Sequence, residues 1–466
     1  MNRTFSLLPI LIAAFLAGCN LAPTYTRPEA PVPAAWPGAA SGQPAVKPDP
    51  SAADTPWRDF IVDEKLRKVI DLALANNRDL RVAALNVQRT QALYRIQRAE
   101  LLPSVNASGT YSKERVPGIL SQAGQPANVE LYNLNVGISA WEIDLFGRIR
   151  NLSEAALQQY FATEQARASA QIALVAQVAG TYLALAADRE NLRLAQSTLD
   201  TQQQTYEMIR RRAEVGASSD LDLRQAQTRV DAARVDIALY TSQVAFDENA
   251  LNLLAGAPVS PELLPNGLGE VGALRDFTPD LPSEVLLRRP DVLQAEGQLK
   301  AAHANIGAAR AAFFPSITLT TSIGTTSGQL SGLFTAGTDT WLFAPQITMP
   351  IFDARTWAAY DVTKVDREIA IAQYEKAIQT GFREVADALA QRATLGNQLQ
   401  AQQSLVDASE ISYRLSDARY TRGIDSYLRV LDAQRSLYSA QQGLIAIRLA
   451  RLANLVTIYK VLGGGS

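Results

Sequence analysis

Residues 133–151 read NLNVGISAWEIDLFGRIRN, and this stretch decides the fold. Its first part alternates apolar with polar or small residues, and Leu134, Val136 and Ile138 supply the apolar side. Period-two alternation predicts a β-strand, because successive side chains of a strand point to opposite faces. After Gly147 the alternation stops and helix-forming residues begin, so this glycine is predicted to permit the turn. The chain is therefore predicted to have a mixed α+β fold.

The same alternation occurs three more times, at 104–111, 316–323 and 340–349. With the strand at 133–140, these segments predict two β-hairpins, over 104–143 and 315–352. Each segment is about ten residues long, which is the length of a tilted transmembrane strand. Four transmembrane β-strands per chain are therefore predicted.

Long helices are predicted to follow each hairpin, over 148–255 and 354–461. No proline occurs between Pro126 and Pro258, or after Pro350, and both stretches are rich in helix formers such as Ala, Gln, Leu and Arg. A helix from Arg148 to Val215 would be about 100 Å long. Helices of that length are typical of coiled coils or of the walls of a helical barrel.

The chain is predicted to contain a two-fold internal repeat, with halves at 61–262 and 263–466. Four collinear matches indicate it, at a spacing of roughly 210 residues. The paired segments are Asn77–Leu80 with Arg289–Val292, Leu101–Val105 with Phe313–Ile317, Leu145–Gly147 with Ile351–Asp353, and Gly216–Gln227 with Gly423–Gln434. Each half is expected to run helix, two strands, long helix, turn, long helix.

The start of the chain predicts export and lipidation. Residues 1–18 combine Arg3 with a short apolar run, as in a signal peptide, and end directly before Cys19. Small residues ahead of this cysteine, the only one in the chain, resemble a bacterial lipobox, so Cys19 is expected to carry lipid. Asn20 is not the aspartate of an inner-membrane retention signal, which favours the outer membrane. The proline-rich segment 19–60 is predicted to be an extended tether.

Charge and hydropathy limit what the mature chain can be. The formal net charge is -2 and no basic patch of the nucleic-acid-binding kind occurs. We expect no transmembrane helix, so β-strands would have to enter the membrane. Four strands cannot close a barrel, and an open edge in lipid leaves backbone groups unpaired at several kcal/mol each. Three copies would supply a twelve-stranded barrel wide enough for a water-filled passage.

The chain resembles the TolC-like outer-membrane efflux family, in its OprM-type lipoprotein branch. The motifs that carry the resemblance are Leu16–Cys19, Trp141–Gly147, Leu287–Val292, Ala308–Pro315 and Leu431–Arg435. The resemblance implies a homotrimer with a shared 12-stranded β-barrel in the outer membrane and a helical barrel in the periplasm. It also implies a periplasmic adaptor and an inner-membrane transporter of the resistance-nodulation-division type as partners. No cofactor is expected apart from the covalent lipid.

Two short turns are predicted to join antiparallel helices, at 214–220 and 421–426. Gly216 and Gly423 are expected to supply left-handed C-caps. Either residue of the pairs Ser219/Asp220 and Asp425/Ser426 can cap the helix that follows. By resemblance these tips meet the adaptor, and the contact residues would be Val215, Gly216, Ser219, Arg422, Gly423 and Asp425. Simple turn chemistry explains the same residues without any contact.

A gate is expected on the last helix, where Leu428, Asp432 and Arg435 lie one turn apart on one face. The family places a constriction at the matching positions, closed at rest. In a trimer, three Asp432 carboxylates would repel one another unless Arg435 or another base paired with them. Leu428 would add an apolar plug. The plainer interpretation is a solvated charged face.

The resemblance implies the exit duct of a tripartite efflux pump, which would conduct drugs and other small molecules passively, and three other functions compete with it. An enzyme is disfavoured, because the only histidine, His303, lies in an Ala-rich helical stretch and no catalytic, phosphate-binding or metal-binding motif occurs. A coiled-coil lipoprotein would not need lipid-facing hairpins. The exit duct of a type I protein secretion system remains the alternative, since the family serves both kinds of export.

Overall fold

The computed structural model describes residues 20–36, 55–121, 124–272, 274 and 283–464. The predicted signal peptide, Cys19 and part of the predicted tether lie outside these residues. The chain divides into two compact units. The first contains the sheet and is made of Met1–Glu29, Asn86–Glu164 and Gln294–Glu375, and the second is made of Ala30–Leu85, Gln165–Leu293 and Lys376–Ser466. Each unit is described by itself.

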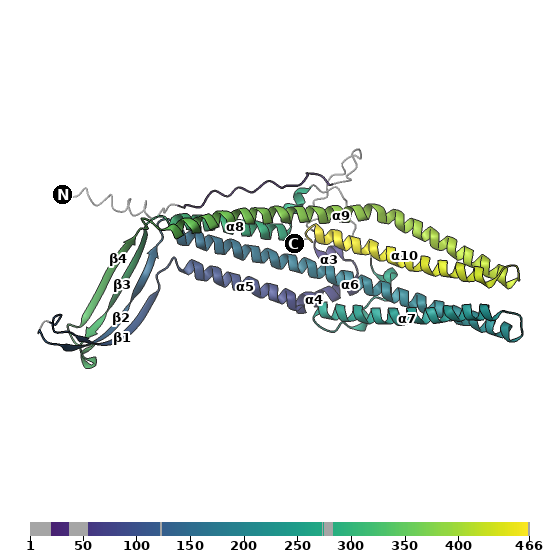
Figure 1. Ribbon diagram of the computed structural model, residues 1–466, viewed down its shortest axis with the longest axis horizontal. Helices are drawn as coiled ribbons and strands as arrows, with labels where there is room; N and C mark the ends of the chain where they lie inside the picture. Colours follow the sequence, from purple (N-terminus) through teal and green to yellow (C-terminus); the bar gives the residue numbers. More distant parts are fainter. Residues whose placement is uncertain (1–19, 37–54, 122–123, 273, 275–282, 465–466) are drawn as a thin grey trace. The chain divides into compact units, whose positions relative to one another are not determined.

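The first unit contains one antiparallel sheet with the strand order β1-β2-β3-β4 (Figure 1). The strands are β1 (Val105–Val116), β2 (Ala127–Ile143), β3 (Ser316–Ser327) and β4 (Asp339–Thr348). All four predicted strands are thus confirmed, and β2 is longer than the alternation indicated. The outer strands β1 and β4 each pair on one side only among the described residues.

The two faces of this sheet differ in polarity, as the alternation predicted. On one face Val136 lies opposite Ile323, which lies opposite Trp341, and the last two side chains are 69% and 78% exposed. On the other face Asn133 accepts a hydrogen bond from Thr326 Oγ1 at 2.6 Å and donates one to Thr110 at 3.3 Å. A sheet with one exposed apolar face and one hydroxyl- and amide-rich face suits a boundary between lipid and water.

Four long helices follow the hairpins, as predicted. They are α6 (Arg148–Glu214), α7 (Asp220–Ala255), α9 (Ala354–Thr421) and α10 (Tyr427–Val461). In Figure 1, α6 and α7 form one helical hairpin and α9 and α10 form another. We expected no transmembrane helix, and this expectation was wrong in one respect. The length and composition of α6 would allow it to cross a membrane, since it contains a window of mean hydropathy 1.5. Of that window 61% is buried, so packing within the chain accounts for its apolarity.

The first predicted helix, from Asp63 to Leu101, is two helices in the structure. They are α4 (Glu64–Asn76) and α5 (Arg78–Ala99), interrupted at Asn77. The Asn77 side chain accepts a hydrogen bond from Leu80 N at 2.9 Å and donates one to Leu254 O at 3.0 Å. Asparagine bonds to nearby backbone groups in this way at helix starts, and apolar periodicity does not reveal it.

The remaining helical elements are short, apart from one. They are α3 (Trp57–Phe60), α8 (Pro290–Ala311) and the 3-10 turns η1 (Pro261–Leu263), η2 (Leu268–Glu270), η3 (Ser283–Arg288) and η4 (Leu330–Gly332). In the second unit, the buried Arg289 just before α8 donates to Val461 O, Asp291 and Glu384. One guanidinium thus ties the end of α10 to α9.

Candidate functional site

The two helical hairpins end in tips of the same backbone geometry. Gly216 and Gly423 have φ values of 72° and 73°, in the left-handed region that glycine adopts without strain. At the first tip Ala217 N donates to Arg212 O at 2.8 Å, and at the second Ile424 N donates to Arg419 O at 3.0 Å. These bonds close the last turn of α6 and of α9, so the predicted glycine C-caps are confirmed.

The helix that leaves each tip begins differently. Ser219 caps α7, because its Oγ accepts from Asp222 N at 3.1 Å and Asp222 Oδ2 accepts from Ser219 N at 3.3 Å. This reciprocal pair is a capping box. At the second tip Ser426 makes no capping hydrogen bond, so the predicted cap there was wrong.

Asp425 instead forms an ion pair across the second tip. Its Oδ2 lies 2.5 Å from Nε of Arg419, on the preceding helix. The hydrogen bond from Arg419 holds the pKa of Asp425 below its usual value and raises the pKa of Arg419. The second tip is therefore held by a charge pair, and the first tip by a capping box.

Apolar side chains at the tips are exposed to solvent. Val215 is 78% exposed at the first tip and Ile424 is 57% exposed at the second. Leu221, at the start of α7, is 66% exposed. The polar tip residues Ser219 and Arg422 are also exposed. Each tip thus presents a small apolar surface bordered by polar groups.

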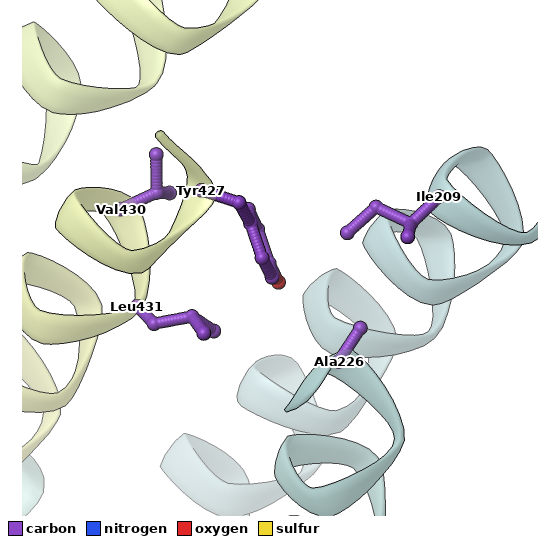
Figure 2. Close-up of a cluster of buried hydrophobic side chains, with 5 residues drawn as sticks. All are labelled: Ile209, Ala226, Tyr427, Val430 and Leu431. Atoms are coloured by element: carbon purple, nitrogen blue, oxygen red, sulfur yellow. The ribbon is translucent and has the colours of Figure 1, made fainter. Parts of the chain in front are cut away.

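A buried cluster lies directly behind the tips (Figure 2). Tyr427, Val430 and Leu431 of α10 pack with Ile209 of α6 and Ala226 of α7, all at most 3% exposed. Burial raises the pKa of the Tyr427 hydroxyl, which keeps its proton. This tip cluster joins the start of α10 to the other helical hairpin.

The predicted gate residues lie on a different face of α10 from the tip cluster. Leu428 is 52% exposed, and the side chains of Asp432 and Arg435 are 54% and 64% exposed. Arg435 Nη2 lies 3.4 Å from Asp432 Oδ1, so the two charges pair within one helix. The structure brings the three residues together on a solvent-facing surface of the single chain.

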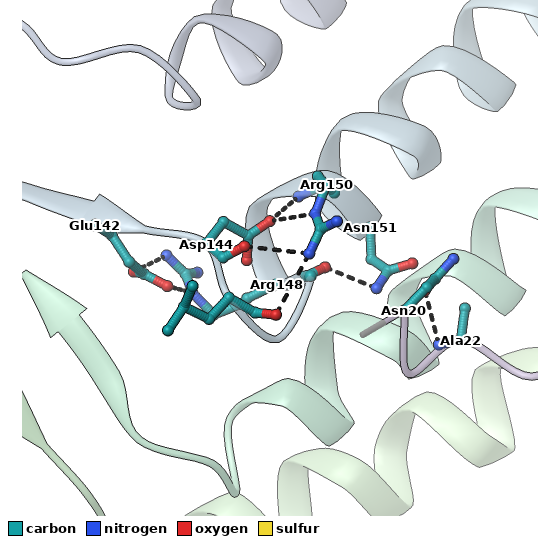
Figure 3. Close-up of polar contacts among 9 residues, drawn as sticks. Asn20, Ala22, Glu142, Asp144, Arg148, Arg150 and Asn151 are labelled. Atoms are coloured by element: carbon teal, nitrogen blue, oxygen red, sulfur yellow. Dashed lines mark hydrogen bonds and ion pairs between the residues drawn. The ribbon is translucent and has the colours of Figure 1, made fainter. Parts of the chain in front are cut away.

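The junction between sheet and helix is held by ion pairs (Figure 3). Arg148 donates to both carboxylate oxygens of Glu142, at 2.9 and 2.7 Å. Asp144 Oδ2 accepts from both the backbone N and Nε of Arg150, at 2.9 and 3.2 Å. Gly147, with φ of 78°, makes the turn, as predicted. These contacts fix the direction in which α6 leaves β2.

A family model described as outer membrane efflux protein matches residues 69–257 and 281–464. The chain belongs to this family. Over 464 residues it is 49% identical to the probable efflux pump outer membrane protein TtgC of Pseudomonas putida, covering 99% of this chain and 96% of that protein. It is also 42% identical to the outer membrane protein OprJ of Pseudomonas aeruginosa, over 99% of this chain and 96% of that protein.

Solved structures of this family have the same fold. The open state of the MtrE outer membrane channel of Neisseria gonorrhoeae matches with a TM-score of 0.85 and 38% identity, over 96% of this chain and 98% of that one. A membrane protein of Pseudomonas aeruginosa matches with a TM-score of 0.90 and 40% identity, over 96% and 98%. The efflux family, the fold class and the outer-membrane location predicted from the sequence are thereby confirmed.

Two features of the tips escaped the sequence analysis. Tyr427, Val430 and Leu431 recur at helical spacing, so apolar periodicity alone could have placed them in a core. The pairing of Arg419 with Asp425 has no such signal, because the contact crosses a turn. Within the described ranges, no three His, Cys, Asp or Glu side chains gather as a metal site would need.

Proposed function

We propose that this protein is the outer-membrane exit duct of a tripartite efflux system. It would conduct drugs and other small molecules passively, from an inner-membrane resistance-nodulation-division transporter through a periplasmic adaptor to the outside. The observation that carries the proposal is a four-stranded sheet with two one-sided edges, in a chain 49% identical to an efflux pump outer membrane protein. The family's members are channels, and we propose no enzymatic activity for this one.

A homotrimer with a shared 12-stranded barrel is part of the proposal. In lipid, the outer edges of β1 and β4 must find partners, and β-strands of other copies supply them. Exposed apolar residues on α7 support the same association in water. Val235, Leu239, Phe246 and Leu253 recur at helical spacing and are 57 to 79% exposed. Such a stripe is costly on a monomer and is buried when copies pack side by side.

An internal repeat accounts for the architecture. The order helix, two strands, long helix, long helix occurs twice, in α5-β1-β2-α6-α7 and in α8-β3-β4-α9-α10. The family model likewise matches two segments of similar length. Both observations support the proposed halves, 61–262 and 263–466.

The gate and the adaptor contacts are proposed from position. Leu428, Asp432 and Arg435 would narrow the periplasmic mouth of the trimer and hold it closed at rest. The tips, with Val215, Gly216, Ser219, Arg422, Gly423 and Asp425, would meet the adaptor and open it. Their exposed apolar groups support a docking role.

A complementation experiment tests this function. The gene is expressed, with its genomic partner pump, in cells that lack their own outer-membrane efflux channel. We expect drug resistance to return, and drug accumulation to fall, only when channel and pump are both present. Export of an unfolded protein substrate through a secretion ATPase, with no gain in drug resistance, would favour the type I secretion alternative.

A further inference from the structure

The N-terminal segment 20–29, here called the strap, is extended and docks on α8 in the sheet-containing unit. Its proline content predicted an extended tether, but the contacts are those of a bound peptide. Glu296 of α8, only 3% exposed, is their centre. It accepts two hydrogen bonds from Arg27, at 3.1 and 2.7 Å, and one from the Tyr25 hydroxyl at 3.1 Å.

Residues of α8 complete the pocket around Tyr25. Lys300, one turn after Glu296, lies 3.1 Å from the Glu296 carboxylate and 5.3 Å from the centre of the Tyr25 ring. The His303 ring packs edge-on against the same tyrosine at 5.4 Å. Burial lowers the pKa of His303, so its ring is neutral at neutral pH and adds no charge beside Lys300. The site therefore recognises an aromatic hydroxyl and a guanidinium two residues apart.

Burial alone would raise the pKa of Glu296. The hydrogen bonds from Arg27 and Lys300 outweigh burial, and the pKa lies below its usual value. The carboxylate is thus ionised and almost fully buried, a state that is costly without its partners. Removing the strap would leave Lys300 as the one partner described for it.

The start of the strap lies at the sheet–helix junction. A methyl group on Gly307 of α8 would meet the Ala22 side chain at 2.8 Å and Asn151 at 2.7 Å, so the strap passes close over this glycine. Asn151 belongs to the first turn of α6, directly after β2, and donates to Gly147 O at 2.7 Å. Leu21 O accepts from Arg310 at 3.2 Å. Figure 3 shows Asn20 and Ala22 beside Asn151.

We propose that Glu296 is the receptor of an intramolecular latch, which binds Tyr25 and Arg27 and holds the strap so that a lipid on Cys19 starts at the end of the membrane strands. Asn20 follows Cys19 directly in the chain, and neighbouring Cα atoms are about 3.8 Å apart. The latch therefore sets the level of the anchor, while the lipid supplies only membrane affinity. This role of the latch rests on the lipidation of Cys19 that the sequence predicts, whereas the contacts of the strap with α8 do not.

The latch is tested by protease access in the full-length, detergent-solubilised protein. Chymotrypsin cleaves after an accessible aromatic residue, so cleavage after residue 25 reports release of the strap. We expect cleavage to accelerate about tenfold or more in Arg27→Ala, because hydrogen bonds between charged groups are the strong ones. Tyr25→Phe keeps the cleavage site but loses one hydrogen bond, and should accelerate cleavage about threefold.

Controls separate the latch from general damage. Arg27→Ala and Tyr25→Phe change no residue of α8. Arg27→Lys should restore part of the protection from chymotrypsin, because it keeps the positive charge. Glu29→Gln, an exposed change in the same segment, should cleave like the parent. Glu296→Gln should release the strap while the sequence of the strap stays unchanged.

Parent-like protection in Arg27→Ala and Glu296→Gln, with the protein folded, would overturn the latch. The proposed channel is judged separately, from trimer mass and drug efflux of the parent protein. A released strap in the variants with normal efflux supports the latch and leaves the channel intact. Absence of efflux in a parent whose strap is protected would count against the channel alone.

Discussion

At the scale of single residues, a turn depends on its own backbone, whereas a buried charge depends on partners elsewhere in the chain. Gly147, Gly216 and Gly423 were identified because a left-handed turn needs glycine whatever surrounds it. The contacts of Arg289 with Val461 and of Glu296 with Arg27 were not predicted, since these partners lie 172 and 269 residues away in sequence. No spacing rule joins residues so far apart, and a single sequence carries no other signal of their contact.

A buried carboxyl on α7 predicts pH-dependent stability. Asp247 is 9% exposed, and burial together with a hydrogen bond to Asp188 raises its pKa to about 6. The folded protein therefore holds a proton that the unfolded chain releases near pH 4. The bound proton stabilises the folded state below about pH 4, and this stabilisation is lost as the pH rises to about 6. Asp247→Asn should therefore raise the melting temperature at pH 7.5. The expected gain in the free energy of unfolding is roughly 1–2 kcal/mol.

The gain from Asp247→Asn should vanish below about pH 3, where the wild-type carboxyl is protonated in both the folded and the unfolded state. Thermal unfolding of the detergent-solubilised protein at several pH values measures this. Asp231→Asn is the matched control, because that side chain is 54% exposed and pairs with Arg234 one helical turn away. An equal gain in the control, or a gain that does not depend on pH, would contradict the assignment.

At the scale of elements, the sequence predicted the kind of each segment better than its ends. Alternation identified all four strands, and missing prolines identified the four long helices, because both signals repeat over many residues. The break at Asn77 was missed, since one side-chain hydrogen bond to Leu254, far along the chain, decides it. The cap predicted at the second tip was missed for a similar reason. Asp425 pairs with Arg419 of the preceding helix, and Ser426 makes no capping hydrogen bond to α10.

Two glycines that end helices in the same conformation should tolerate alanine differently. Gly216 and Gly256 have φ values of 72° and 68°, so alanine costs about 1 kcal/mol of strain at either position. A Cβ at residue 216 meets nothing within 4 Å, whereas one at residue 256 would lie 2.4 Å from Asn76 O. Gly256→Ala should therefore lower the melting temperature clearly more than Gly216→Ala, because α4 must move away from α7. Equal shifts would mean that the contact with α4 is not rigid.

At the scale of the whole molecule, two features of the chain support the proposed trimer. The sheet has two one-sided edges, and apolar residues of α7 face solvent. The strand count predicted the open sheet edges from the sequence, since four strands cannot enclose a passage. The sequence did not predict which helix faces would meet between copies in the proposed trimer. Helical spacing identifies an apolar face, but not the face of a second copy that would cover it.

The exposed apolar stripe of α7 predicts which change would weaken the proposed trimer. Phe246 is 62% exposed in the single chain, and burying such a side chain at a seam contributes about 1.5–3 kcal/mol per copy. Phe246→Asp should therefore shift the detergent-solubilised protein from three chain masses toward one, as measured by native mass spectrometry. Thr241→Asp, at an exposed polar position on another face of the same helix, should remain trimeric. A monomeric parent with full β-sheet content would refute the trimer itself.

The proposed gate also depends on the proposed trimer, because an exposed patch on one chain would become a constriction only when three copies surround it. An exposed ion pair such as Asp432–Arg435 contributes about 0.2–1 kcal/mol, and the proposed trimer would repeat it three times. Since about 1.4 kcal/mol changes an equilibrium tenfold, loss of three pairs can shift a closed channel toward the open state by more than tenfold. Leu428→Ala removes the apolar group beside them.

The double change Leu428→Ala with Asp432→Ala should therefore raise single-channel conductance in planar bilayers. It should also sensitise cells to large antibiotics that normally stay outside. Trimer yield should change little, because Leu428, Asp432 and Arg435 lie outside the buried tip cluster of Tyr427, Val430 and Leu431. Asp231→Ala, which breaks another exposed pair one helical turn apart, should conduct like the parent. If the double variant folds, inserts and still conducts like the parent, the constriction lies elsewhere along the tube.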